Sequence, residues 1–276
     1  MIDPRNKITI FHDDNSVFTE YTQEAADYSR DDFSITLSST EDYIYAGFYK
    51  PFGDLYVELT TANTNANTLS AEIYDGTSWV SVTLTDDSKG YTRDGFQHWD
   101  KSDMKEVEIN SVTLYYIRFR PSSDHTATDV RGLNLVFSDD NQLEQEFEEI
   151  TDAGFLPSGR TSHIMSHVSA RNHIIQKLRN IGYLKYDANS RKENLTYWDL
   201  HDVFEIRQAS AFLTLSKIFF NLSDSVDDNW FQKYMEYQKK FDQMFALARL
   251  SIDTDDDGVV DGGEDGRNAQ TLRWTR

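Results

Sequence analysis

The feature that most constrains the fold is a change in hydrophobic period part-way along the chain. Up to about residue 138, short segments alternate apolar and polar side chains at every second position, as in 54–60 and 112–119. From about residue 161, apolar side chains recur roughly every 3.6 residues, which is the period of an α-helix. We therefore expect an α+β multidomain protein, with an antiparallel β-sandwich over residues 1–138 and a small helical bundle over residues 161–252.

The strand-like segments are short, rich in β-branched and aromatic residues, and separated by turn signals. Asp75-Gly76 lies between two of them and favours a tight hairpin, because both residues tolerate positive φ angles. Many short strands with regular turns are typical of a jelly-roll or immunoglobulin-like sandwich. Tyr115, Tyr116 and Trp79 could line a sugar-binding face, but such residues more often pack in the core or across strands.

Three helices are expected in the second half, at about 162–180, 198–220 and 228–250. Gly182 is placed to end the first helix, and Thr196 is placed to cap the start of the second. The second helix carries apolar residues around most of its circumference, so we expect it to be central and buried.

The composition excludes several classes of protein. The chain has 276 residues, a formal net charge of -20, a sequence pI of about 4.6 and no cysteine. An acidic surface repels phosphate backbones, so direct nucleic-acid binding is not expected as the main task. The lack of cysteine excludes disulfides and thiolate zinc sites. We see no secretory signal and no run of about 18 apolar residues, so we expect synthesis in the cytoplasm and no membrane insertion.

Residues 139–160 are expected to form a linker with a short helix, and residues 253–276 a calcium-type loop with a C-terminal docking tail. In the loop, acidic residues occupy the first, third, fifth, ninth and twelfth positions, and Gly258 the sixth. This spacing wraps a chain around one calcium ion. The alternative is a solvated acidic turn that holds no ion. The expected ligands are the side chains of Asp253, Asp255, Asp257, Asp261 and Glu264 and the backbone carbonyl of Val259.

His163 and His167 lie four residues apart, so they share one face of the first expected helix. A histidine pair can bind a metal but needs a further ligand, and we interpret these two as ordinary helix-surface or interface residues. No nucleophile elbow and no glycine-rich phosphate loop occurs in the sequence. We therefore expect no catalysis; a carboxylate pair for glycoside cleavage is the enzymatic alternative.

The second half has a characteristic order of segments. The run ASAFLTLSKIFF at 209–220 precedes DNWFQKYMEYQKKF at 228–241, and the acidic loop and an arginine-bearing tail follow. In this order, residues 161–276 resemble the head-to-tail connector, or adaptor, proteins of tailed bacteriophages. The first half is similar to sandwich modules that recur on phage virion proteins, through segments 73–80, 95–99 and 115–120.

The resemblance implies a structural virion protein of the particle's neck, which forms a homo-oligomeric ring of about twelve copies between portal and tail. It implies that the portal protein and other neck or tail proteins are the partners, and that DNA passes through without specific binding. The alternative is a carbohydrate-binding or host-attachment module, associated with a tail or fibre, with a calcium-stabilised appendage. The tail residues expected to dock on the portal are Asn268, Thr271, Leu272, Arg273, Trp274 and Arg276.

Overall fold

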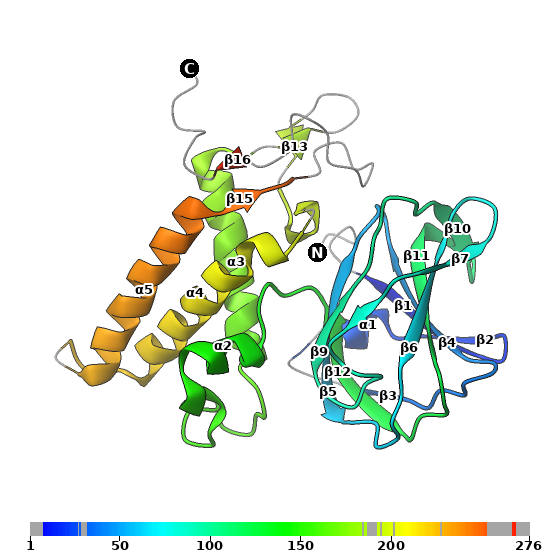
Figure 1. Cartoon of the computed structure of the whole chain (residues 1–276), viewed down its shortest axis with the longest axis horizontal. Coiled ribbons are helices and arrows are strands. Elements are labelled where there is room, and N and C mark those ends of the chain that lie inside the picture. Colours follow the sequence, from blue (N-terminus) through cyan, green and yellow to red (C-terminus); the bar gives the residue numbers. More distant parts are fainter. Residues whose placement is uncertain are drawn as a thin grey trace. The chain divides into compact units, whose positions relative to one another are not determined.

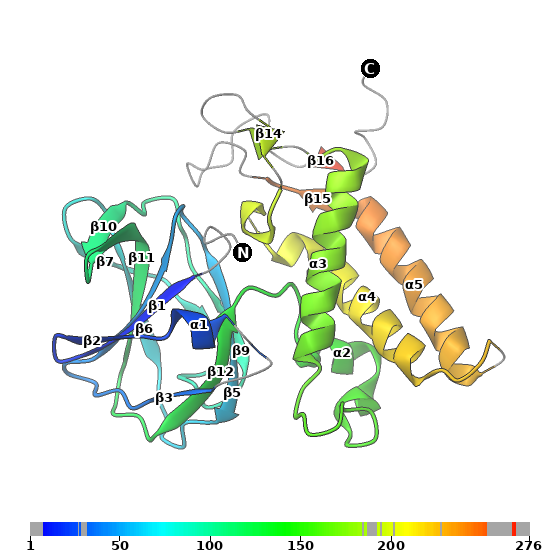
Figure 2. The same cartoon turned by 180° about the vertical axis from the view of Figure 1, so that it is seen from behind.

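The computed structural model describes residues 8–26, 28, 32–183, 185–186, 192–193, 195–200, 202–226, 228–252 and 267–268. The protein is α+β, with antiparallel sheets in its first half and most of its helices in its second (Figure 1, Figure 2). The chain divides into two compact units: the β unit, up to Leu135, and the helical unit, from Val136 onward. No helix in the described part of the chain is long and apolar enough to cross a membrane.

The β unit contains two antiparallel sheets and a short helix, α1 (Thr22–Ala25). The seven-stranded sheet has the order β2-β1-β4-β11-β6-β7, with β10 also paired to β11, and the five-stranded sheet has the order β3-β12-β5-β9-β8. The strands of the first sheet are β1 (Thr9–Asp14), β2 (Val17–Glu20), β4 (Tyr43–Phe48), β6 (Leu69–Tyr74), β7 (Trp79–Val82), β10 (Glu106–Ile109) and β11 (Val112–Pro121). Those of the second are β3 (Phe33–Ile35), β5 (Asp54–Thr61), β8 (Thr85–Asp86), β9 (Gly95–His98) and β12 (Thr128–Asn134).

The hairpin expected at Asp75-Gly76 is confirmed between β6 and β7. Gly76 has a φ of 101°, which a residue with a β carbon rarely adopts. The Asp75 carboxylate accepts hydrogen bonds from the backbone N–H groups of Thr77 and Ser78, both at 2.8 Å. These bonds hold the turn, and Tyr74 then pairs with Trp79 across the two strands.

One face of the seven-stranded sheet is an aliphatic layer. Strand register aligns Ile10, Ala46, Ile117 and Ile73 in a row across β1, β4, β11 and β6. All four side chains are buried. Because successive residues of a strand point to opposite faces, the residues between these belong to the other face of the same sheet.

The other face of this sheet is covered by aromatic side chains. Phe11, Tyr45 and Tyr116 form a buried cluster there. Tyr116 pairs with Gly47 across β11 and β4, and a β carbon built on Gly47 would lie 2.1 Å from the tyrosine ring. The ring therefore needs a glycine beneath it in order to lie flat against the sheet.

Replacing Gly47 with alanine should destabilise the protein by about 1–3 kcal/mol, because the new methyl group must push Tyr116 out of its packed position. The free energy of unfolding, measured by urea denaturation, checks this. Gly154→Ala is the matched control, because a β carbon at Gly154 would meet nothing within 4 Å. Equal stability of Gly47→Ala and wild type would show that the ring does not lie as described.

The β unit buries the ring of one histidine, His125. His125 is 4 % exposed, and neither of its ring nitrogens has a partner among the described residues. Its ring packs edge-on against Tyr91 at a centroid distance of 5.6 Å. Burial disfavours the charged imidazolium and lowers the pKa of His125 from 6.5 to about 4.

This lowered pKa makes stability depend on pH. Between pH 6.5 and about 4 the unfolded chain binds a proton at His125 that the folded protein excludes, so stability present at neutral pH is lost on acidification. We expect the loss from this residue to reach up to roughly 3 kcal/mol. The variant His125→Phe, which cannot titrate, should show a shallower decline when urea unfolding is measured across this range. Identical pH profiles for the two proteins would contradict this account.

The helical unit is built around three long helices: α3 (Ile164–Ile181), α4 (Phe204–Leu222) and α5 (Asn229–Leu247). Helix α4 packs against both α3 and α5, and α2 (Asp140–Glu146) also contacts it. The smaller elements are η2 (Glu148–Thr151), η3 (Tyr197–Asp199), and the two-residue strand pairs β13 (Lys185–Tyr186) with β14 (Lys192–Glu193) and β15 (Arg249–Leu250) with β16 (Arg267–Asn268).

The expected helices are present with shifted ends. Gly182 ends α3 as predicted, with a φ of 101°. The predicted start of the second helix near residue 198 is wrong, because Thr196 caps the short turn η3 instead. There the Asp199 side chain accepts hydrogen bonds from the Thr196 backbone N–H and from its hydroxyl group. Leu200 is then extended, and α4 begins only at Phe204.

Candidate functional site

A buried chain of hydrogen bonds joins α2, α3 and α4. His167 on α3 lies 3.0 Å from the Asp140 carboxylate through Nε2 and 2.9 Å from the Ser138 hydroxyl through Nδ1. Ser138 is in turn 2.9 Å from the hydroxyl of Ser210 on α4. If Nε2–H donates to Asp140, then Nδ1 is free to accept from Ser138, and every member of the chain has a partner.

The two neighbouring carboxylates, Asp139 and Asp140, have pKa values shifted in opposite directions. Burial raises the pKa of Asp139. Burial alone would also raise the pKa of Asp140, but its hydrogen bond to His167 and its electrostatic interactions with His167 and His163 hold that pKa below its ordinary value. Asp140 also accepts from the backbone N–H of His163, at 3.1 Å. Asp140 is therefore the charged end of the network.

The interpretation of His163 and His167 as surface or interface residues is wrong. Each is 1 % exposed, and the Nε2 of His163 donates to the carbonyl of Ile150 at 2.9 Å. The reason is local: the chain turns back after α2 and η2, so that polar groups of residues 138–150 reach the start of α3. One indication of this network was present in the sequence. The segment Ser138-Asp139-Asp140 places a hydroxyl and two acids directly after an apolar strand pattern.

The Ser138–His167–Asp140 chain contains the residue types of a hydrolytic triad, but a substrate cannot reach it. Ser138 is fully buried and His167 is 1 % exposed, so a substrate carbonyl has no path to the hydroxyl. The hydroxyl also faces Nδ1 rather than Nε2, the reverse of the usual arrangement in serine hydrolases. The network is best explained as a structural cross-link among three helices.

Replacing Ser138 with alanine should cost about 1–3 kcal/mol of stability, because the buried Nδ1 of His167 loses its near partner. Only the Thr214 hydroxyl, at 3.4 Å, remains close to that nitrogen. The free energy of unfolding checks this, with the exposed Ser169→Ala as the control on the same unit. A stable Ser138→Ala protein would remove the structural explanation.

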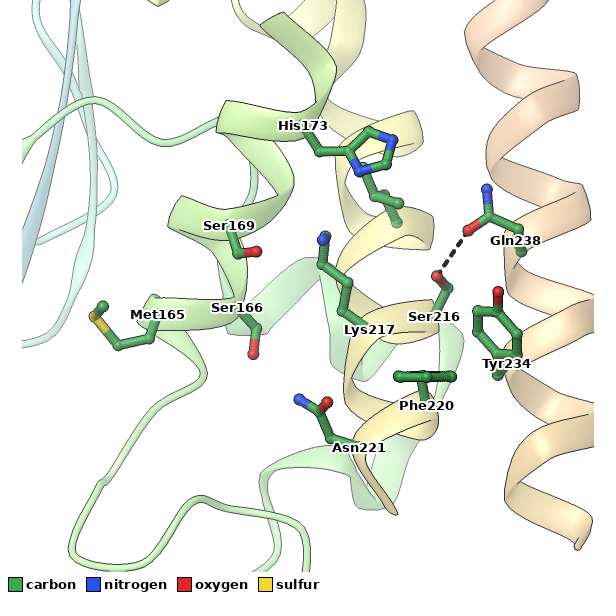
Figure 3. A pocket seen from close by; sticks show the side chains of 11 residues that line it. Met165, Ser166, Ser169, His173, Ser216, Lys217, Phe220, Asn221, Tyr234 and Gln238 are labelled. Carbon is green, nitrogen blue, oxygen red and sulfur yellow. Dashed lines mark hydrogen bonds between the residues drawn. The ribbon is translucent and has the colours of Figure 1, made fainter. Parts of the chain in front are cut away.

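The helical unit also has a hollow, which we call the α4 groove. It has a volume of about 450 Å³ and lies on α4 between α3 and α5 (Figure 3). Ser216 on α4 donates to Gln238 on α5 at 3.2 Å, and Phe220 packs on Tyr234 across the same helices. The lining residues are Met165, Ser166, Ser169, His173, Leu213, Ser216, Lys217, Phe220, Asn221, Tyr234 and Gln238.

Two of the aromatic residues considered for sugar binding, Tyr116 and Trp79, pack against other side chains of the protein. Tyr116 is fully buried, which confirms the packing interpretation for this residue. Trp79 packs against Tyr45 and Tyr74, and the guanidinium of Arg118 lies 4.4 Å from its ring centroid. Arg118 is held there by Glu72, at 2.6 Å. Trp79 therefore already stacks on a side chain of the protein itself.

The predicted calcium ligands, Asp253 to Glu264, and the tail residues Thr271 to Arg276 lie outside the described residues. Only the backbone of Asn268 is described, and with Arg267 it pairs with the strand β15. Within the described residues, no group of three or more histidine, aspartate or glutamate side chains could hold a metal ion. The calcium site and the docking tail therefore stay predictions from the sequence.

No family model matches the chain, and no curated protein matches it. Among solved structures, it is similar to a family 89 glycoside hydrolase from Clostridium perfringens in complex with 2-acetamido-1,2-dideoxynojirmycin, with 11% identity, a TM-score of 0.28, and coverage of 63% of this chain and 19% of that chain. The same hydrolase in complex with PUGNAc gives 12% identity, a TM-score of 0.27, and coverage of 63% and 20%. The chain spans about a fifth of the length of these structures. Likenesses with TM-scores this low carry no argument about its fold or activity.

Proposed function

We propose that the protein is a non-catalytic assembly component whose helical unit binds other protein subunits. The observation that supports this proposal is the location of the exposed apolar side chains. The described residues expose eight large apolar side chains, and six of them belong to the helical unit: Met165, Phe204, Phe220, Val226, Met235 and Leu247. Exposed apolar groups gathered on one unit favour a protein interface, because their burial by a partner removes them from water.

Two of these side chains, Met235 and Leu247, are the clearest candidates for interface residues. They are 51 % and 69 % exposed on α5, although this helix already contributes Tyr237, Phe241 and Phe245 to the core. Their exposure is therefore not needed for packing α5 on α4. A neighbouring subunit that covers them would gain about 0.8 kcal/mol for each buried methylene group.

The specific form that we propose is a head-to-tail adaptor of a tailed phage, which forms a ring between portal and tail at the neck of the virion. Its support is the resemblance of residues 161–276 to that family, together with an acidic chain past which DNA slides without being held. In this proposal the two antiparallel sheets form a sandwich and the three long helices a bundle. The calcium loop then fixes the start of the tail, and the tail docks on the portal.

The test combines imaging with an interface variant. We expect cryo-electron microscopy of virus particles that carry this protein to place it in a ring beneath the portal. The double variant Met235→Ser, Leu247→Ser should leave the free energy of unfolding within about 0.5 kcal/mol of wild type, because both side chains are exposed. It should nevertheless lower the amount of the protein in purified particles, since the interface loses apolar area.

Gln243→Ser is the matched control, an exposed polar change on the same helix. Normal incorporation of the double variant would show that these two positions of α5 are not part of an assembly surface. Density for the protein only on fibres would contradict the adaptor role and favour host attachment.

A further inference from the structure

The α4 groove carries a positive charge that no acidic residue of its lining offsets. Lys217 extends from α4 into the groove (Figure 3), and among the described residues its ammonium group makes no ion pair or hydrogen bond. None of the eleven described lining residues is aspartate or glutamate, although the whole chain has 47 acidic and 27 basic residues. An unmatched cation in such an acidic protein calls for an explanation.

Two other lysines of the helical unit are matched. Lys177 pairs with Asp242 at 2.6 Å, and Lys240 pairs with Glu236 at 2.9 Å. All three lysines are partly buried, but among the described residues Lys217 has no carboxylate partner of this kind. A partly desolvated charge gains more from a nearby opposite charge than an exposed one does.

The electrostatics of the groove also favour an anion. Burial lowers the pKa of Lys217. The pKa of His173, which lines the groove from α3, is lowered by its own burial and then by the positive charges of Lys217 and Lys177, against the opposing charge of Asp242. A negative group bound between Lys217 and His173 would offset the burial cost of the ammonium.

The remaining lining divides into polar and apolar parts. Ser166 and Ser169 extend from α3 on the same side as the Lys217 ammonium group (Figure 3). Leu213, Phe220 and the ring of Tyr234 supply apolar surface from α4 and α5. The volume of about 450 Å³ is in the range of small-molecule sites. An occupant that satisfies both parts has an anionic head and a short apolar body.

We propose that the α4 groove binds a small organic carboxylate, with its carboxylate group on Lys217 and its apolar body along Leu213 and Phe220. Lys217 is a compact point charge that accepts a carboxylate without a fixed geometry, and the hydroxyls of Ser166 and Ser169 lie on the α3 side as neutral donors. This site is tested separately from the assembly role, whose tested residues Met235 and Leu247 lie outside the groove lining.

The test uses the full chain and three probes: hexanoate, the neutral hexanamide, and acetate. Binding is followed by NMR through the ring signals of His173 and the methyl signal of Met165, both of which line the groove. We expect hexanoate to give saturable shifts, hexanamide to give none, and acetate to bind more weakly because it lacks the apolar body. Lys217→Met keeps the apolar stem but removes the charge, and should weaken hexanoate binding about tenfold or more.

Lys240→Met is the matched control, because it removes a lysine charge from α5 outside the groove lining. It should bind hexanoate as wild type does, and a thermal melt establishes that both variants are folded. Three results would each overturn the proposal: no saturable shift with hexanoate at tens of millimolar, equal binding of hexanoate and hexanamide, or unchanged hexanoate binding by Lys217→Met. The comparison of the two probes on wild-type protein stands even if the variant fails to fold.

Discussion

Helix α4 is apolar around almost its whole circumference, so other elements of the helical unit must pack on nearly every side of it. Every residue from Ala209 to Phe219 is buried except Lys217, so no face of this stretch tolerates full contact with water. Helices α3 and α5 flank it, and Phe147, which follows α2, packs edge-on against Phe219. Among the described elements, cover is incomplete along Lys217 and Phe220, and there the groove opens. The hollow is a consequence of surrounding one apolar helix with too few neighbours.

Buried hydroxyl groups on α4 and beside it favour one position of this helix relative to its neighbours. Apolar contacts alone would let two helices slide along each other at little cost, because many registers bury similar area. Ser210 and Ser138 allow one arrangement, since each must meet its hydrogen-bond partner inside the core. Thr214 adds a bond to the carbonyl of Ser210 within the helix, at 2.9 Å. The network therefore contributes specificity as well as stability.

Much of this architecture could be predicted from the sequence, because periodicity records which face of an element is buried. The switch of period, the hairpin at Asp75-Gly76 and the end of α3 at Gly182 all follow from local chemistry. The start of α4 could not be read in this way. Thr196 caps the short turn η3 rather than a long helix, and the apolar residues around Trp198 and Leu200 fit a helix although the chain makes a turn there.

The site residues were harder to predict for a different reason. His167 and Ser138 are 29 residues apart in the sequence, and nothing local shows that they touch. The same holds for Lys217, which reads as one more polar residue on a helix until α3 and α5 are seen on either side of it. Spacing can suggest a site that one segment would build alone, as in the prediction for the acidic loop at 253–264, which lies outside the described residues. It cannot predict a site that three helices build together.

The tyrosines that lie across glycines have a consequence for how this sequence can change over time. Tyr116 crosses Gly47, and Tyr28 crosses Gly132, where an added β carbon would lie 2.3 Å from the ring. The hydroxyl of Tyr28 also donates to the carbonyl of Asn134, at 3.2 Å, which fixes the ring in place. In each pair, the tyrosine ring fills the space that a side chain at the glycine position would need. Among related chains they should therefore co-vary, with a larger residue at the glycine position only where the tyrosine has become smaller.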